Sequence, residues 1–213
     1  MRAVMISIQP KWVAKIAKGK KTIVVRKTAP KCEVPFKCYI CCTSAKPYLY
    51  KEANPPFELF LDSELYEGKG YDDRLFSGKV IGEFICDKII EWQYDKGHQY
   101  YVDYHDDCTS YFPYLKCHSE ATGLKCSEIE KLGKGKPLYG WHISDLKIYD
   151  KPKELSEFKK TKERIAITCG MQAGNGLCRA IDYEELCDNI KCCFKTPCPP
   201  QSWCYVEELQ GRN

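Results

Sequence analysis

The stretch from Met5 to Lys27 reads MISIQPKWVAKIAKGKKTIVVRK, and its pattern decides the fold. Residues 5–8 are mostly apolar, as in a short buried strand. Pro10 then stands where proline is favoured, in the first turn of a helix, and Gly19 is a typical end for that helix. Residues 22–26 are rich in β-branched side chains, which favour a second strand. The sequence therefore predicts a strand, a short helix and a second strand, with a tight turn between the last two.

This end of the chain is strongly basic. The first 31 residues hold nine Lys or Arg and no acidic residue. The whole chain carries 33 basic and 29 acidic residues, a net charge of +4; without those nine, 24 basic residues remain against 29 acidic ones, a balance of −5. A local positive field attracts polyanions whatever the net charge. Nucleic acid or a phosphorylated ligand is therefore the expected class of partner.

Four basic residues around the tight turn form a candidate phosphate-binding cluster: Lys20, Lys21, Arg26 and Lys27. Strand alternation places residues 22, 24 and 26 on one face, which favours a cleft that contains Arg26. A guanidinium offers planar two-point contact to a phosphate, whereas lysines act as point charges. The alternative is a solvated turn without a ligand.

Two tryptophans, Trp12 on the predicted helix and Trp141 on a predicted strand, have two interpretations each. They can stack on a base, as aromatic platforms do in single-strand recognition. They can also pack in the core, which is the commoner role of a large aromatic residue in such elements. Trp12 is the better candidate for ligand contact.

Three further segments favour strands: residues 36–43, 78–92 and 139–149. The last changes phase between its apolar residues, as a strand with a bulge does. The segments 44–77 and 93–116 are expected to be excursions from the main fold. Short, non-adjacent strands with few helices predict an α+β fold, either a small bent β-barrel with short flanking helices or a strongly bent sheet with helices that cover its ends.

The composition indicates a folded protein without a membrane segment. At 213 residues and 44% hydrophobic content, the chain can bury a substantial core. It has no run of 18 apolar residues and no apolar signal region near its first residue. We therefore expect a cytoplasmic protein with no membrane partner.

Cysteine is abundant, with 15 residues. An odd count in a chain of this length, without a secretory signal, favours reduced thiols over a disulfide framework. Residues 151–213 are Cys-rich and are expected to form an extension that packs on a first domain of residues 1–150. Four cysteines of this extension are candidate ligands of a structural zinc ion: Cys187, Cys192, Cys198 and Cys204. Because the extension has no Cys-x2-Cys pair, buried free thiols remain the alternative to a zinc site. We expect that the protein requires no cofactor.

Three motifs in the first 150 residues are distinctive. One is Ser7-Ile-Gln-Pro-Lys-Trp12, followed by Gly19, Lys21 and Arg26. The other two are GKVIGE at residues 78–83 and YGWHISDLKIY at residues 139–149. Together they resemble the ASCH domain, a PUA-like β-barrel, and are similar to ASCH proteins of bacteriophages and Gram-positive bacteria.

This resemblance implies RNA or a modified nucleotide as the ligand, because PUA-like barrels are mostly RNA-binding. Some ASCH members are enzymes, one group resembling amidohydrolases that act on acetylated cytidine and another acting as ribonucleases. In the family motif a Glu, or a Thr in the amidohydrolase, stands two residues before the Arg. Val24 occupies that position here, and a valine neither attacks a substrate nor transfers a proton.

Two alternatives to simple binding therefore stay open. One is an ASCH-type hydrolase in which Lys21 is the catalytic group, assisted by a carboxylate such as Glu83 or Glu128. The other is a phage protein-interaction module whose excursions and Cys-rich extension contact a host protein.

Overall fold

Two long bent segments organise the fold. In the computed structural model, residues 80–95 form β7 (Val80–Cys86) and β8 (Ile89–Asp95), and residues 138–153 form β11 (Leu138–His142) and β12 (Ser144–Lys153). β7 pairs antiparallel with β12, and β8 pairs antiparallel with β11. Both segments therefore cross from one sheet into another, which confirms the bent sheet and the interrupted strand that the sequence predicted.

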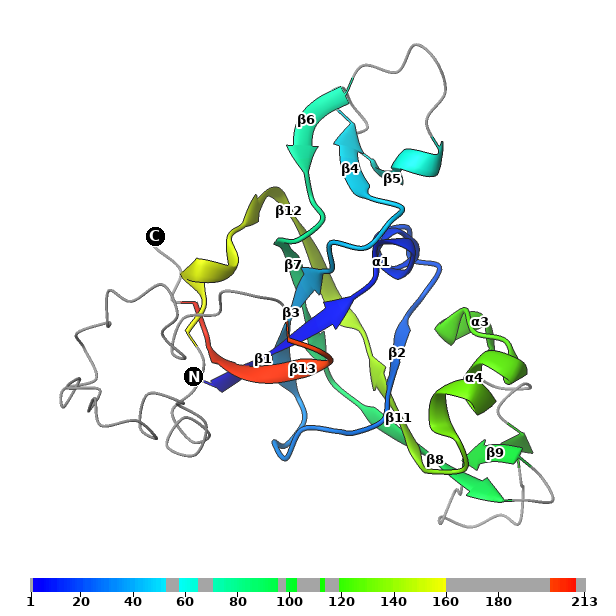
Figure 1. Ribbon diagram of the computed structural model, residues 1–213. Helices are drawn as coiled ribbons and strands as arrows, with labels where there is room; N and C mark the ends of the chain where they lie inside the picture. The colour runs from blue at the N-terminus through cyan, green and yellow to red at the C-terminus, as the bar shows by residue number, and fades with distance from the viewer. Residues whose placement is uncertain are drawn as a thin grey trace, which may run out of the picture.

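The structure describes residues 2–52, 58–64, 71–95, 99–102, 112–113, 119–159 and 200–209. Within them, one five-stranded sheet has the order β12-β7-β3-β1-β13 and a second has the order β10-β9-β8-β11-β2. Their remaining strands are β1 (Arg2–Ile8), β2 (Ile23–Arg26), β3 (Phe36–Cys42), β9 (Gln99–Val102), β10 (Phe112–Pro113) and β13 (Trp203–Glu207). A third sheet, of order β5-β4-β6, projects from the other two on the side of α1 (Figure 1). It consists of β4 (Leu49–Glu52), β5 (Leu59–Leu61) and β6 (Tyr71–Leu75).

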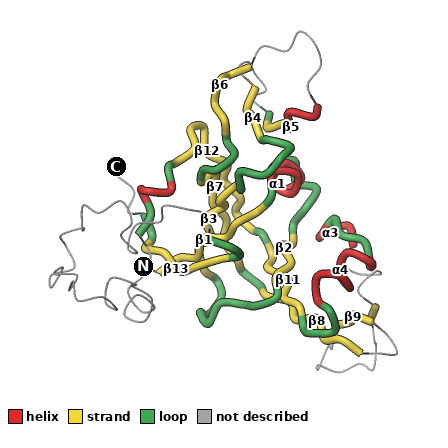
Figure 2. Tube along the Cα trace, viewed as in Figure 1, coloured by secondary structure: helices red, strands yellow, loops and turns green. Residues whose placement is uncertain are grey.

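The helices are few and short, as an α+β fold with flanking helices requires (Figure 2). The predicted helix after the first strand is α1 (Pro10–Ala17), with proline in its first turn. Gly19 follows it with a φ of +68°, a left-handed conformation that glycine adopts without strain. α3 (Ser119–Thr122) and α4 (Cys126–Gly133) lie beside β2, and single 3-10 turns occupy Asp62–Glu64 and Leu155–Glu157.

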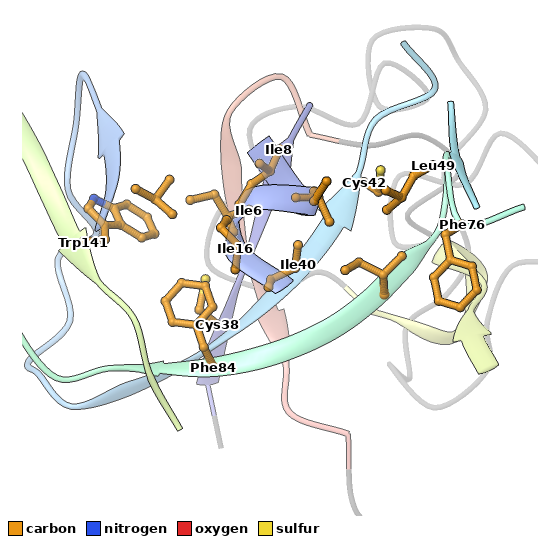
Figure 3. Packing of buried hydrophobic residues seen from close by; sticks show 14 of the residues in the cluster. Ile6, Ile8, Ile16, Cys38, Ile40, Cys42, Leu49, Phe76, Phe84 and Trp141 are labelled. Atoms are coloured by element: carbon orange, nitrogen blue, oxygen red, sulfur yellow. The ribbon is translucent and has the colours of Figure 1, made fainter. Parts of the chain in front are cut away.

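The main core lies between α1 and the strands of the first sheet (Figure 3). Ile6, Ile16, Phe84 and Trp141 are almost fully buried in it. The Trp141 ring meets Phe36 edge to face, with the ring centroids 5.9 Å apart. Trp141 is therefore a core residue and does not present a face to a ligand.

β2 alternates between two cores, and this alternation sets up the site. Val24 faces the main core, whereas Ile23 and Val25 pack in a second core that includes Trp92 and Ile129. Arg26, two residues after Val24, therefore lies on the same face of the strand as Val24. β2 is the edge strand of its sheet, and among the described strands it pairs only with β11. The two sheets are thus open along β2.

The C-terminal strand belongs to the first sheet. β13 pairs antiparallel with β1, with Val206 opposite Ala3, and Val206 is fully buried. β12 continues through Asp150 to Lys153. The division of the chain at residue 150 stays a prediction. In the part of the chain that the structure describes, no helix has the length and apolar character needed to span a membrane.

Candidate functional site

A cavity of about 560 Å³ lies at the open edge along β2. This volume is within the range of small-molecule sites in proteins. Its walls come from the end of β1, the start of α1, β2, the residue after β3, the α3–α4 region and the two residues before β13. The lining residues are Ser7, Ile8, Gln9, Trp12, Lys21, Val24, Val25, Arg26, Lys27, Thr28, Thr43, Leu124, Leu132, Gln201 and Ser202. Among these described residues the charges are all positive.

Lys21 is the most unusual residue of the cavity, because its side chain is charged in water but is only 4% exposed here. Its Nζ donates a hydrogen bond to the carbonyl oxygen of Thr122, at the end of α3. Burial, helped by the charges of Arg26 and Lys15, lowers the pKa of Lys21 to about 7, while the charge of Glu128 acts in the opposite direction. At neutral pH both the charged and the neutral amine are therefore present.

Arg26 ties the two walls of the cavity together. Its Nη2 donates to the carbonyl oxygen of Ser7 on β1 at 2.6 Å, and its Nη1 donates to the carbonyl oxygen of Val25 at 2.9 Å. The Nε atom is buried and has no hydrogen-bond partner among the described residues. Burial lowers the pKa of Arg26 to about 10, so the guanidinium is still charged at neutral pH. Two of its five N–H donors thus bond to backbone carbonyl oxygens. The sequence predicted instead a guanidinium available for two-point contact with a phosphate.

Trp12 lies at the wall of the cavity and is partly buried. Lys11, Lys15 and Lys21 place their Nζ atoms 4.7, 4.9 and 5.2 Å from the centroid of its ring. Cations over an indole are attracted by its π-electron density. The aromatic residue and the basic residues that the sequence singled out therefore form one cluster, joined by two lysines of α1.

Two other lining residues limit the chemistry of the cavity. Val24 is 1% exposed and contributes an apolar wall that carries no nucleophile and no group able to transfer a proton. Thr43 Oγ1 is buried without a hydrogen-bond partner among the described residues. A buried hydroxyl without a partner is costly. Thr43 is therefore a polar group that a ligand in the cavity can satisfy.

Some residues predicted for the site lie elsewhere. Lys27 lines the cavity, but Lys20 is exposed and is not one of the lining residues. Glu83 is also outside the lining: its carboxylate accepts a 2.6 Å hydrogen bond from the Tyr149 hydroxyl and lies 3.8 Å from the ammonium of Lys37. Of the two carboxylates considered as helpers of Lys21, Glu128 is the one whose charge acts on it.

The zinc prediction falls mostly on residues that are not described. Cys187, Cys192 and Cys198 lie outside the described residues, and Cys204 is a partly buried residue of β13. Within the described ranges, no group of three or more His, Cys, Asp or Glu side chains is arranged to hold a metal. The structural zinc site stays a prediction.

Sequence reasoning missed the C-terminal contribution to the cavity. Gln201 and Ser202 line it, and the carbonyl oxygen of Ser202 accepts a 2.9 Å hydrogen bond from the Ser7 amide. Nothing near these residues in the sequence signals a site, because their position depends on β13 pairing with the distant β1. Leu124 and Leu132 also line the cavity, and their place there likewise depends on contacts between distant parts of the chain.

No family model matches this chain, and no curated protein matches it. Among solved structures, the chain is similar to the crystal structure of ASCH from Zymomonas mobilis, with 13% sequence identity and a TM-score of 0.49 over 97% of this chain and 88% of that one. A tyrosine-to-phenylalanine mutant of the same Zymomonas mobilis protein gives 14% identity and a TM-score of 0.49 over 97% and 91% of the two chains. At this level of identity the likeness assigns no role to any residue of the cavity.

Proposed function

We propose that the protein binds RNA or a modified nucleotide, and that one nucleotide enters the cavity between β1, α1 and β2. The observation that carries this proposal is the burial of Lys21 beside Trp12 in a cavity whose described lining residues carry only positive charges. A buried ammonium with two cationic neighbours is stabilised by an anionic or electron-rich ligand. Nucleotides supply both an anion and an aromatic base.

The other lining residues suit a base or a ribose. Gln9, Thr28 and Gln201 offer amide and hydroxyl groups, which hydrogen-bond to exposed edges of unpaired bases. Val24 and Leu132 provide apolar surface against which a ring can pack. A volume of about 560 Å³ leaves room for one nucleotide and its solvent but not for a duplex. The ligand is therefore a single unpaired residue of a strand, or a free nucleotide.

The test is a binding titration with a matched pair of variants. Labelled single-stranded RNA, duplex RNA and DNA are titrated at about 50 and about 200 mM salt, because phosphate contacts make affinity depend on salt. Lys21→Met removes the buried ammonium, and Lys20→Met removes the neighbouring exposed one. We expect single-stranded RNA to bind most tightly, and Lys21→Met to weaken binding by about tenfold or more while Lys20→Met changes it less than about threefold. Absence of binding to every polymer and nucleotide at low salt would contradict the proposal.

A second function, hydrolysis, is favoured by one specific observation. An amine with a pKa of about 7 is able to accept or donate a proton at neutral pH, and Glu128 is a carboxylate close enough to influence it. Val24 supplies no nucleophile, so water would have to attack the amide of acetylated cytidine, and water or the neighbouring 2′-hydroxyl would have to attack the phosphodiester of RNA. Turnover of acetylated cytidine, or cleavage of RNA, that disappears in Lys21→Met but persists in Lys20→Met would establish this activity. Binding without turnover in the wild type would exclude it for these two substrates.

A further inference from the structure

Three lysine ammonium groups surround the single ring of Trp12. Lys11 and Lys15 lie four residues apart on α1 and are themselves exposed. Lys21 approaches the same ring from inside the cavity. All three Nζ atoms lie within 5.2 Å of the ring centroid. The indole thus contacts one buried ammonium and two solvated ones.

Direct ion pairs do not neutralise these three charges in the part of the chain that the structure describes, although the charge of Glu128 acts on Lys21. Among the described residues, none of the three forms an ion pair with a carboxylate, whereas Lys18, further along the same segment, lies 3.8 Å from Glu64. The positive charge of Lys15 is one of the causes that lower the pKa of Lys21, so the groups repel one another. Attraction to the ring offsets only part of this repulsion. An anion between the ammonium groups would remove it.

The turn after α3 adds a boundary to this cluster. A Cβ atom on Gly123 would lie 3.7 Å from Trp12 Cζ3 and 3.8 Å from Lys15 Nζ, so the backbone of this turn lies close to both side chains. The preceding residue, Thr122, accepts the hydrogen bond from Lys21. Trp12 and Lys15 therefore lie between α1 and the α3–α4 turn. Lys11 and Lys15 do not line the cavity, but their ammonium groups lie over the ring of Trp12, which does, and we call this position next to the cavity its rim.

We propose that this rim binds the phosphate of a nucleotide, with Lys11 and Lys15 contacting the phosphate while the nucleoside enters the cavity past Lys21. The inference rests on the proposed function and deepens it, because it makes the ligand a phosphorylated nucleotide and not a free nucleoside. The phosphate is either the terminal group of a mononucleotide or a diester of an RNA strand. The two sources share this chemistry and are distinguished by the ligands of the test.

The test uses calorimetric titration of the whole chain with the four common ribonucleosides, their 5′-monophosphates and the corresponding dinucleoside phosphates. The site variant is Lys11→Ala, Lys15→Ala. The control is Lys18→Ala, Lys20→Ala, which removes the same charge from exposed positions of the same segment outside the Trp12 cluster. All four lysines are exposed, so both variants are expected to fold, and a thermal melt checks this.

In the wild type we expect phosphorylated ligands to bind at least about tenfold more tightly than nucleosides, since a charge-assisted contact is lost in the nucleoside. The site variant should lose this advantage and the control should keep it. A preference for the monophosphate over the dinucleoside phosphate would assign a terminal phosphate, and the reverse would assign a strand.

Two results would overturn the phosphate site and leave the proposed function standing. One is equal affinity for nucleosides and their phosphates. The other is an equal loss of RNA or nucleotide affinity in the site variant and the control. Absence of binding to RNA and to all of these ligands by the wild type would overturn both proposals.

Discussion

Arg26 Nη2 lies 2.6 Å from the carbonyl oxygen of Ser7, and this bond joins β2 to β1 across the edge at which the two sheets are open. The same residue lines the cavity, so the arginine both holds the walls and contributes to the charge inside. Its role in stability and its role in binding can be separated by experiment.

Replacing Arg26 is expected to destabilise the protein. Arg26→Ala removes the donors to the carbonyl oxygens of Ser7 and Val25, and bonds from a charged donor contribute about 1.5–3 kcal/mol each. We expect the free energy of unfolding in urea to fall by about 2 kcal/mol or more. Lys27→Ala, at the exposed neighbour, should change it by less than about 0.5 kcal/mol. If the free energy of unfolding changed equally little in both variants, the hydrogen bond between Arg26 and Ser7 would not stabilise the fold.

The buried amine of Lys21 should make stability depend on pH. In the unfolded chain a lysine has a pKa of about 10.4, whereas here burial lowers it to about 7. Between these values the unfolded chain binds more protons, so the free energy of unfolding rises with pH, by at most about 1.4 kcal/mol per unit. Below pH 7 both states are protonated and the cost of burying the charge is fully present. Lys21→Met should flatten this rise when urea unfolding is measured from pH 6 to pH 9; parallel curves would contradict the burial of Lys21.

Deprotonation of Lys21 should also affect RNA binding: as the pH rises, affinity should fall while stability increases. An anionic ligand needs the charged amine, so affinity for RNA is expected to fall as the pH rises through about 7. Lys21→Arg retains its charge throughout this range. The affinity of the Lys21→Arg variant for RNA should therefore stay constant from pH 6 to pH 9, whereas the affinity of the wild type declines over this range. An identical decline in Lys21→Arg would assign the pH dependence to another group.

Gly140 is expected to tolerate no side chain. A Cβ atom there would lie 2.2 Å from Cη2 of Trp92, which is fully buried. Overpacking of this kind costs about 1–3 kcal/mol. Gly140→Ala should therefore lower the urea midpoint, and the smaller ring of Trp92→Phe in the same chain should restore part of the loss. Additive effects of the two substitutions would show that the two residues do not conflict.

The side chain of Gln201 should contribute to affinity without contributing to stability. Gln201 is an exposed residue that lines the cavity, so Gln201→Ala is expected to weaken RNA binding by about threefold to tenfold. Its thermal midpoint should equal that of the wild type. Glu207→Ala, at the far end of β13, serves as the control and should bind normally. If both variants bind as the wild type does, the segment forms a wall that the ligand does not touch.

The sequence predicted well what depends on local patterns. Pro10 and Gly19 mark the ends of α1 closely, and the β-branched run at residues 23–25 is β2. The phase change within residues 139–149 corresponds to the break between β11 and β12 at Ile143. Each of these signals comes from steric preferences of a few neighbouring residues, and such preferences are present in the sequence itself.

The site was predicted less completely, because its chemistry depends on distant parts of the chain. The burial of Lys21 depends on a carbonyl oxygen 101 residues away. The sequence predicts that Arg26 faces a ligand, but one of its donors bonds to Ser7 of the approaching β1 and another bonds to the carbonyl oxygen of Val25, the preceding residue of β2. Glu83 is a predicted partner of Lys21, yet the pairing of β7 with β12 brings it near Tyr149, and the pairing of β7 with β3 brings it near Lys37. Sheet register decides these contacts, and no short motif encodes it.

The position of the ligand on the protein is the decisive observation. Single-stranded RNA that carries 4-thiouridine is bound, irradiated with near-ultraviolet light and mapped by mass spectrometry of the crosslinked peptides. We expect crosslinks at Trp12 and in the segments 24–28 and 201–202 that line the cavity, and their loss in Lys21→Met but not in Lys20→Met. Crosslinks that fall only outside the cavity, for example on the sheet of β4, β5 and β6, and that persist in Lys21→Met would contradict binding in this cavity.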